Sequence, residues 1–171
     1  MKHKSFILTL IAVALVSLFS YGQEPAHFVI GANELANTDV YSICQTEEGI
    51  LYAATNNGLY EYRHGQFKSI RGADNQHGNS LFHLKLDQKG QLFCGNLSGQ
   101  ILRLNRGKLE VFFELKKKDI GHELMYEFDV NNHLIIAGKT SCFDVSNGKV
   151  KNLYENKKGI LVRYNVSLVE A

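Results

Sequence analysis

The chain has 171 residues, of which 44% are hydrophobic and 21% are charged, and this composition excludes collagen, a coiled coil and wholesale disorder. The formal charge of +2 comes from Lys2 and Lys4, because no acidic residue precedes Glu24, so the chain after residue 22 is neutral. A neutral domain has little electrostatic reason to bind nucleic acid or an anionic membrane, and neither is expected as a partner.

The first 22 residues predict a secretory signal peptide. A basic region at residues 2–4 precedes an apolar run at 6–19, and Ser20 and Gly22 place small residues at positions −3 and −1 of a cut before Gln23. The competing interpretation is a membrane anchor, which needs about 20 apolar residues, and this run is shorter. We therefore expect an exported protein, with no membrane contact except through the signal peptide or regions beyond this sequence.

The rest of the chain repeats itself. Residues 40–58 align with 81–99 at a shift of 41 residues, and a further shift of 42 carries the pattern to 124–138. Apolar positions and glycines coincide, as where Leu51 meets Leu92 and then Leu134. Internal periodicity of this length indicates a repeat architecture.

Within each copy, turn residues separate four short apolar runs, as expected for strands joined by hairpins. The first turns fall at 48–49, 89–90 and 131–132, and the last at 64–65, 106–107 and 147–148. Some runs are apolar at successive positions, such as ILYAA and LIIAG, which is typical of a sheet covered on both faces. Four antiparallel strands per repeat with both faces buried describe a β-propeller blade.

The expected fold is all-β. It is an incomplete β-propeller within residues 23–171, preceded by a signal-peptide helix at 1–22, with four-stranded blades at about 40–70, 81–115 and 123–154. A strand is expected at each end, at 28–30 and, as the start of a fourth blade, at 160–171. Propellers have four to eight blades, so we expect a fragment of a longer protein, or a chain that associates with another copy. Whether Ala171 is a natural C-terminus stays open.

The segment GILYAATNNGLYEY at 49–62 resembles the two-component regulator propeller repeat, whose pattern is roughly Gly-x-Leu-Trp-x-x-Thr-x-x-Gly-Leu. The matching residues are Gly49, Leu51, Thr55, Gly58 and Leu59, and Tyr52 replaces the tryptophan. The resemblance covers nearly all of residues 27–171. It implies the N-terminal periplasmic sensor propeller of a bacterial hybrid two-component or histidine kinase type protein, with further blades, a membrane helix and a cytoplasmic signalling region elsewhere. It also implies a polysaccharide-derived ligand.

No catalytic, metal or cofactor constellation is expected from the sequence. The seven histidines are scattered without an HxxxH or HxH pattern, and His83 is interpreted as a residue packed within a strand. Asp87 and Asp129 recur once per repeat at the first turn, which favours turn capping over acid–base chemistry. The lysines at 116–118 indicate a solvated loop.

Three cysteines occur in a compartment that tolerates disulfides. Cys44, Cys94 and Cys142 lie in strand-like runs and outside any CxxC motif, so we interpret them as small buried hydrophobes. A single disulfide that leaves one free thiol stays open.

Two sets of propeller loops emerge on one face, namely the segments entering the innermost strand and the turns between the second and third strands. Six residues in these loops are the ligand-binding candidates: Asn37, Asp39, Asn56, Asn57, Asn79 and His122. Their hydrogen-bonding groups suit a carbohydrate or another small extracytoplasmic ligand, and the same residue types are ordinary turn formers.

The leading hypothesis is an extracytoplasmic ligand-sensing module without catalytic activity of its own. One alternative is a propeller-fold lyase-like enzyme, which would need a histidine with an acidic partner on the central loops, and His122 with Glu123 is the pair that fits. The other alternative is a structural module that docks onto another protein.

Overall fold

The computed structural model describes residues 29–120 and 124–155. It divides the chain into two units, residues 1–30 and 31–171, and the elements below belong to the second. The predicted signal peptide at 1–22 and the predicted strand at 160–171 lie outside the described residues. Within 29–120 and 124–155, no helix has the length and apolar character needed to cross a membrane.

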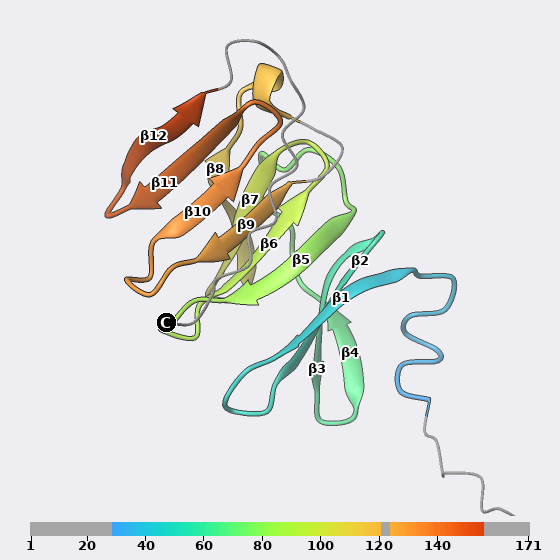
Figure 1. Ribbon diagram of the computed structural model, residues 1–171. Helices are drawn as coiled ribbons and strands as arrows, with labels where there is room; N and C mark the ends of the chain where they lie inside the picture. Colours follow the sequence, from blue (N-terminus) through green and yellow to red (C-terminus); the bar gives the residue numbers. More distant parts are fainter. Residues whose placement is uncertain (1–28, 121–123, 156–171) are drawn as a thin grey trace, which may run out of the picture. The chain divides into compact units, whose positions relative to one another are not determined.

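Three four-stranded antiparallel sheets make up the described part of the second unit (Figure 1). Blade 1 contains β1 (Val40–Gln45), β2 (Leu51–Thr55), β3 (Gly58–Arg63) and β4 (Gln66–Ser69). Blade 2 contains β5 (Leu81–Leu86), β6 (Leu92–Asn96), β7 (Gln100–Asn105) and β8 (Lys108–Glu114). Blade 3 contains β9 (Met125–Phe128), β10 (Leu134–Ala137), β11 (Ser141–Ser146) and β12 (Lys149–Glu155), preceded by the short 3₁₀ helix η1 (Lys117–Asp119). The prediction of an all-β chain with three four-stranded blades is confirmed.

The hairpin between the third and fourth strands has the same turn in every blade. Its two residues are His64 and Gly65, Arg106 and Gly107, or Asn147 and Gly148, and both have positive φ in each case, between 47° and 85°. Two positive φ angles define the type I′ turn, whose twist matches that of the flanking strands. Glycine at the second position adopts this conformation without a Cβ clash, which is why the sequence pattern located these turns.

The hairpin between the first and second strands is capped by a side chain. Asp129 Oδ1 accepts hydrogen bonds from the backbone N–H groups of Asn131, at 2.9 Å, and His133, at 2.7 Å. Asp87 Oδ1 caps the equivalent turn of blade 2 through Lys89 and Gln91, at 2.8 Å each. The turn-capping interpretation of both aspartates is confirmed.

We expect Asp129→Ala to lower the free energy of unfolding by about 1–2 kcal/mol, because two backbone donors lose their acceptor. Burial raises the pKa of Asp129, but the hydrogen bonds from His133 and Asn131 outweigh it, so the pKa is lowered overall. A carboxyl group whose pKa is lower in the folded than in the unfolded state stabilises the fold at pH values above its unfolded-state pKa. This stabilisation is lost as the pH falls through the folded-state pKa. The deficit of the variant, measured by urea unfolding, should therefore shrink at about pH 3. Asp129→Asn retains an acceptor oxygen and should show little deficit at either pH.

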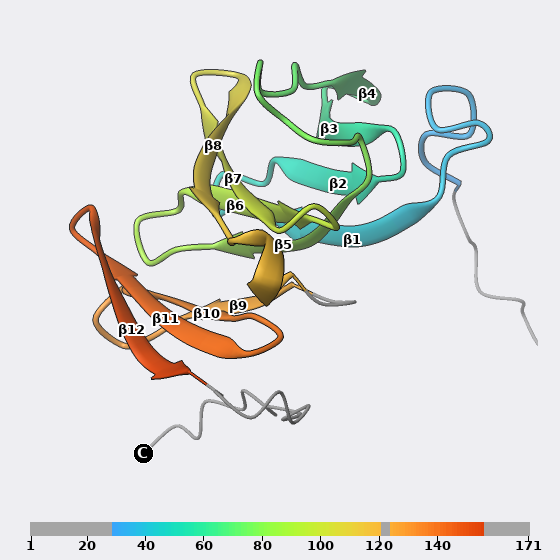
Figure 2. The same cartoon turned by 90° about the horizontal axis from the view of Figure 1, so that it is seen from above.

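Two hydrophobic clusters join the blades in sequence. The first cluster packs Tyr52, Ala54 and Leu59 of blade 1 against blade 2. The second packs Phe93 and Ile101 of blade 2 against blade 3. The strands β1 and β5, which begin their blades, lie next to each other (Figure 2). The core is therefore a series of layers between consecutive sheets.

The predicted strand at 28–30 is wrong. Phe28 lies outside the described residues, and Val29 and Ile30 form no strand. Gly31 has a φ of 78°, and its carbonyl oxygen accepts a hydrogen bond from the Leu35 N–H at 2.9 Å. The chain therefore turns directly after Ile30, and a strand forms only where a neighbouring strand takes up its backbone hydrogen bonds.

The interpretation of His83 as a packed residue is also wrong. His83 is exposed and has a φ of 52°, at a register shift between Phe82 and Lys85 in the pairing of β5 with β6. A β-bulge of this kind breaks the regular alternation of side chains along a strand. It turns the imidazole away from the core.

All three cysteines are free thiols. Cys94 is fully buried, and burial raises the pKa of its thiol to about 12. Cys44 and Cys142 are half-buried, and burial raises the pKa of each thiol as well.

We expect thiol labelling to separate the three cysteines. Iodoacetamide reacts with the thiolate, so native protein at about pH 8 should be modified at Cys44 and Cys142 and should leave Cys94 unmodified until urea unfolds the chain. Peptide mass spectrometry would locate the label. Rapid modification of native Cys94 would contradict its place in the core.

Candidate functional site

The loops that enter each blade meet the turn between the second and third strands of the same blade. In blade 1 the entering segment is 31–39 and the turn contains Asn56 and Asn57. The corresponding pairs are 70–80 with 97–99 in blade 2 and, among the described residues, 115–120 with 138–140 in blade 3. Hydrogen bonds join the described parts of each pair. All the candidate residues that the structure describes belong to these loops.

In blade 1 two of the candidates, Asp39 and Asn56, come together, and two more, Asn37 and Asn57, belong to the same pair of loops. The Asp39 N–H donates to Asn56 Oδ1 at 3.2 Å, and Asn56 Nδ2 donates to Asp39 Oδ2 at 3.4 Å. Asn57 Nδ2 donates to Thr38 Oγ1 at 3.4 Å. Asn37 adopts a left-handed φ of 59° just before this contact, a conformation that asparagine tolerates well. The side chains of Asp39 and Asn56 thus hold each other in place.

The two other candidates stand apart from this cluster. Asn79 is exposed in the segment that enters blade 2. Its neighbour Ser80 approaches the cluster, since Ser80 Oγ donates to the carbonyl oxygen of Asn56 at 3.4 Å. His122, with its expected partner Glu123, lies outside the described residues.

Blade 2 holds its entering segment through a buried amide that the sequence did not single out. Gln100 is fully buried, and its Oε1 accepts hydrogen bonds from the His77 N–H at 2.8 Å and from Asn96 Nδ2 at 2.9 Å. Gln100 Nε2 donates to the carbonyl oxygen of Asn75 and to Glu114 Oε2, each at 3.0 Å. The turn and the entering segment are therefore one hydrogen-bonded unit.

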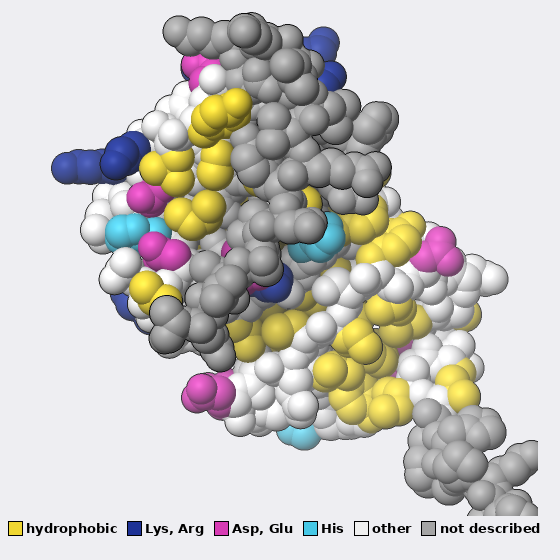
Figure 3. All heavy atoms as spheres, viewed as in Figure 1, with side chains coloured by type: hydrophobic (Ala, Val, Ile, Leu, Met, Phe, Trp, Pro, Cys, Tyr) yellow, Lys and Arg dark blue, Asp and Glu magenta, His cyan; other side chains and the backbone are white. Residues whose placement is uncertain are grey.

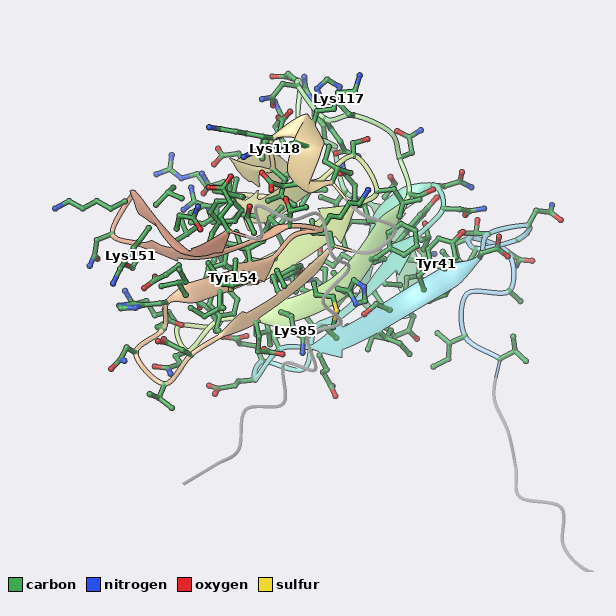
Figure 4. The ribbon with its side chains drawn as sticks, turned by 45° about the horizontal axis from the view of Figure 1, so that its top comes forward. Tyr41, Lys85, Lys117, Lys118, Lys151 and Tyr154 are labelled. Atoms are coloured by element: carbon green, nitrogen blue, oxygen red, sulfur yellow. The ribbon has the colours of Figure 1, made fainter. Side chains whose placement is uncertain are left out.

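In blade 3 a buried carboxylate joins the entering segment to the turn between the second and third strands. Asp119 is 1% exposed, and its Oδ1 accepts hydrogen bonds from Thr140 Oγ1 at 2.7 Å and Ser141 Oγ at 2.6 Å. The Lys139 N–H donates to the Asp119 carbonyl oxygen at 2.7 Å. The preceding lysines at 116–118 are exposed, and Lys117 and Lys118 project from η1 in Figure 4. These hydrogen bonds join η1 to the turn between β10 and β11.

A stacked aromatic pair lies just after the segments that enter blades 1 and 2. Tyr41, labelled in Figure 4, stacks on Phe82 with ring centroids 4.6 Å apart and an interplanar angle of 21°. Each ring follows its entering segment by two residues, and Tyr41 is 45% exposed. Lys85 of β5 forms an ion pair with Glu127 of β9, with Nζ 2.6 Å from Oε2. The sequence marked Tyr41 and Phe82 only as apolar repeat residues, and their meeting depends on the packing of β1 against β5.

These groups can bind a ligand through hydrogen bonds and ring stacking. Within residues 29–120 and 124–155, no group of three or more histidine, cysteine, aspartate or glutamate side chains could hold a metal ion. His133 Nδ1 lies 3.7 Å from Asp129 Oδ2 and 3.6 Å from Asp144 Oδ1, but this group belongs to the turn between β9 and β10, at the opposite end of the strands. It is separate from the candidate site.

Residues 34–57 match the model of the two component regulator propeller family. This stretch contains Asp39, Asn56 and Asn57 of blade 1. The recognition of this repeat from the sequence is confirmed. No curated protein matches the chain.

Solved propeller structures resemble this fold. The extracellular domain of the putative hybrid two component system BT4673 from B. thetaiotaomicron has 19% identity and a TM-score of 0.59, over 80% of this chain and 19% of that one. The corresponding domain of BT3049 from B. thetaiotaomicron has 25% identity and a TM-score of 0.57, over 72% and 17%. Virginiamycin B lyase from Staphylococcus aureus has 12% identity and a TM-score of 0.58, over 77% and 45%. The chain spans less than half the length of each.

Proposed function

We propose that this chain is a ligand-sensing module of a two-component signal transduction protein, located in the periplasm after export through the signal peptide at 1–22. The observation that carries the proposal is the match of residues 34–57 to the two component regulator propeller family, in the blade that contains the clustered Asp39 and Asn56. The likeness to extracellular domains of putative hybrid two component systems supports it. In this proposal the parent protein supplies further blades, with a fourth beginning near residue 160, and a separate signalling region.

The proposed ligand is a carbohydrate. Sugar rings present hydroxyl groups at their rims and C–H groups on their faces, so they suit amide and carboxylate groups beside an aromatic ring. Asp39, Asn56 and Asn57 supply the polar groups, and the stacked rings of Tyr41 and Phe82 supply the apolar surface. The proposal assigns no cofactor and no catalysis to these residues.

Isothermal titration of the chain with neutral hexasaccharides of glucose, xylose and mannose tests this proposal. We expect Tyr41→Ala to weaken binding of the recognised sugar about tenfold, because an aromatic contact contributes about 1 kcal/mol or more. Val130→Ala is the control, since this exposed residue lies in the turn between β9 and β10. Equal sugar affinities of the Tyr41 and Val130 variants would show that the aromatic pair does not contribute to ligand binding.

The lyase-like alternative rests on the fold likeness to virginiamycin B lyase and on His122 with Glu123. A His122→Ala variant with unchanged lyase turnover would remove His122 as the catalytic residue, and a parent protein without lyase turnover would eliminate the alternative. The docking alternative, in which the chain attaches to another protein, stays a prediction.

A further inference from the structure

The first strands of blades 1 and 2 each contain a β-bulge close to the segment that enters the blade. In β1 the pairing with β2 shifts between Val40 and Ser42, which leaves Tyr41 as the extra residue. In β5 the pairing with β6 shifts between Phe82 and Lys85. The pairing of β9 with β10 has no shift along its described length. The bulges are therefore a property of these two strands and not of every repeat.

The bulge in β5 removes His83 from both packed faces of the sheet. Leu81, Leu84 and Leu86 all contribute to the cluster between blades 1 and 2, although the first two are three residues apart. A regular strand places residues two apart on the same face, so the extra residue is accommodated between Leu81 and Leu84. Both leucines are buried, whereas His83 is exposed. The imidazole therefore belongs to neither face.

The backbone of His83 is held in an unfavourable conformation by both neighbouring blades. Its φ of 52° is left-handed, which a residue with a Cβ atom adopts only at a cost. The peptide group between His83 and Leu84 donates its N–H to Ser42 Oγ of blade 1 at 3.1 Å, and its carbonyl oxygen accepts from Tyr126 Oη of blade 3. Such strain persists where the surroundings fix it, and it is concentrated at functional sites. A histidine thus occupies a position where glycine would be free of strain.

His83 lies between the stacked rings and an ion pair. Phe82 precedes it and stacks on Tyr41, and Lys85, two residues further along, pairs with Glu127 of β9. The strand β5 forms one edge of its sheet, and β1 lies beside it (Figure 2). An exposed imidazole at this point of β5 extends the candidate site from the loops of blade 1 along the first strand of blade 2.

The charges near these strands favour an uncharged ligand. Lys85 is compensated by Glu127 at 2.6 Å, and Asp39 adds a carboxylate in the loop that enters blade 1. The surface over blade 1 in Figure 3 consists mostly of hydrophobic side chains and uncharged groups. A neutral imidazole carries one hydrogen-bond donor and one acceptor, which match a sugar hydroxyl group.

We propose that His83 is a specificity-determining residue of the ligand site, where its imidazole forms a hydrogen bond with a hydroxyl group of an uncharged sugar whose ring lies against Tyr41. This inference rests on the proposed sensing function. The bulge is the feature that presents the imidazole, because a bulge redirects a side chain that regular pairing would place on a packed face.

Isothermal titration of His83→Gly tests the proposal with the neutral hexasaccharides of glucose, xylose and mannose. We expect the recognised sugar to bind about tenfold more weakly, because one hydrogen bond to the ligand is lost. Glycine adopts a positive φ without strain and retains the peptide hydrogen bonds of the bulge, so the midpoint of urea unfolding should be unchanged or higher. Lost affinity without lost stability distinguishes a ligand contact from a structural role.

His64→Gly is the matched control. His64 is also exposed and has a φ of 54°, but it lies in the turn between β3 and β4, at the opposite end of the strands from the candidate site. The same substitution there should leave the sugar affinity unchanged. His83→Asn should recover part of the affinity lost in His83→Gly, because asparagine tolerates a left-handed φ and its amide carries both donors and an acceptor.

Failure of this proposal differs from failure of the sensing proposal. A wild-type chain that binds none of the three hexasaccharides would overturn both. If Tyr41→Ala weakens binding while His83→Gly and His64→Gly bind equally well, only the role of His83 is overturned. A lowered urea midpoint of His83→Gly alongside the lost affinity would show that His83 acts through the fold, and would overturn its role as a ligand contact as well.

Discussion

Replacing Gln100 with alanine should be among the most destabilising single changes in the chain, lowering the free energy of unfolding by about 3 kcal/mol. The side chain is fully buried and takes part in four hydrogen bonds, to His77, Asn96, Asn75 and Glu114. Each buried group left without a partner costs about 1–3 kcal/mol. Urea unfolding followed by circular dichroism measures the loss.

Gln45→Ala is the control for this prediction. Gln45 is an exposed glutamine of β1 whose Nε2 donates to the carbonyl oxygen of Gly49 at 3.4 Å, and its loss should change the free energy of unfolding by about 0.5 kcal/mol or less. Similar losses in the two variants would show that the segment at 70–80 does not depend on the amide of Gln100.

The hydrogen bonds of Gln100 also explain which part of the fold the sequence could predict. Hairpins are encoded locally, because a pair such as Asn147 and Gly148 adopts positive φ whatever surrounds it. The contact between Gln100 and His77 joins residues 23 positions apart, and no spacing rule predicts it. Blades were therefore predicted well and the loops between them poorly.

The errors at the first strand and at His83 have the same origin. Val29 and Ile30 have apolar character suitable for a strand, but pairing requires a partner and Gly31 turns the chain. The place of His83 in the middle of an expected strand predicted a packed residue, whereas the bulge between Phe82 and Lys85 exposes it. Local pattern sets the preference of a segment, and its neighbours in space decide whether the preference is realised.

The candidate site was predicted in part for a similar reason. Asp39 and Asn56 were named because propeller loops share a face, and the structure places them in mutual hydrogen bonds. The stacked pair of Tyr41 and Phe82 was missed, because aromatic residues in an apolar repeat are indistinguishable from core residues until the sheets are packed. Binding residues differ from core residues in their exposure, and the sequence of a single repeat does not predict exposure.

The largest contrast between equivalent residues should appear at Leu92 and Leu51. Both begin the second strand of a blade, but Leu92 is 3% exposed in the cluster between blades 1 and 2. Leu51 is half-buried on the face of blade 1 that is turned away from this cluster. We expect Leu92→Ala to cost about 3–4 kcal/mol through lost burial and the cavity left behind. Leu51→Ala should cost about half as much or less at about 1 µM chain.

The residue type, strand position and substitution are the same at both sites, so the difference measures what a preceding blade contributes. Equal costs at about 1 µM would mean that Leu51 is already covered in the monomer, contrary to its exposure.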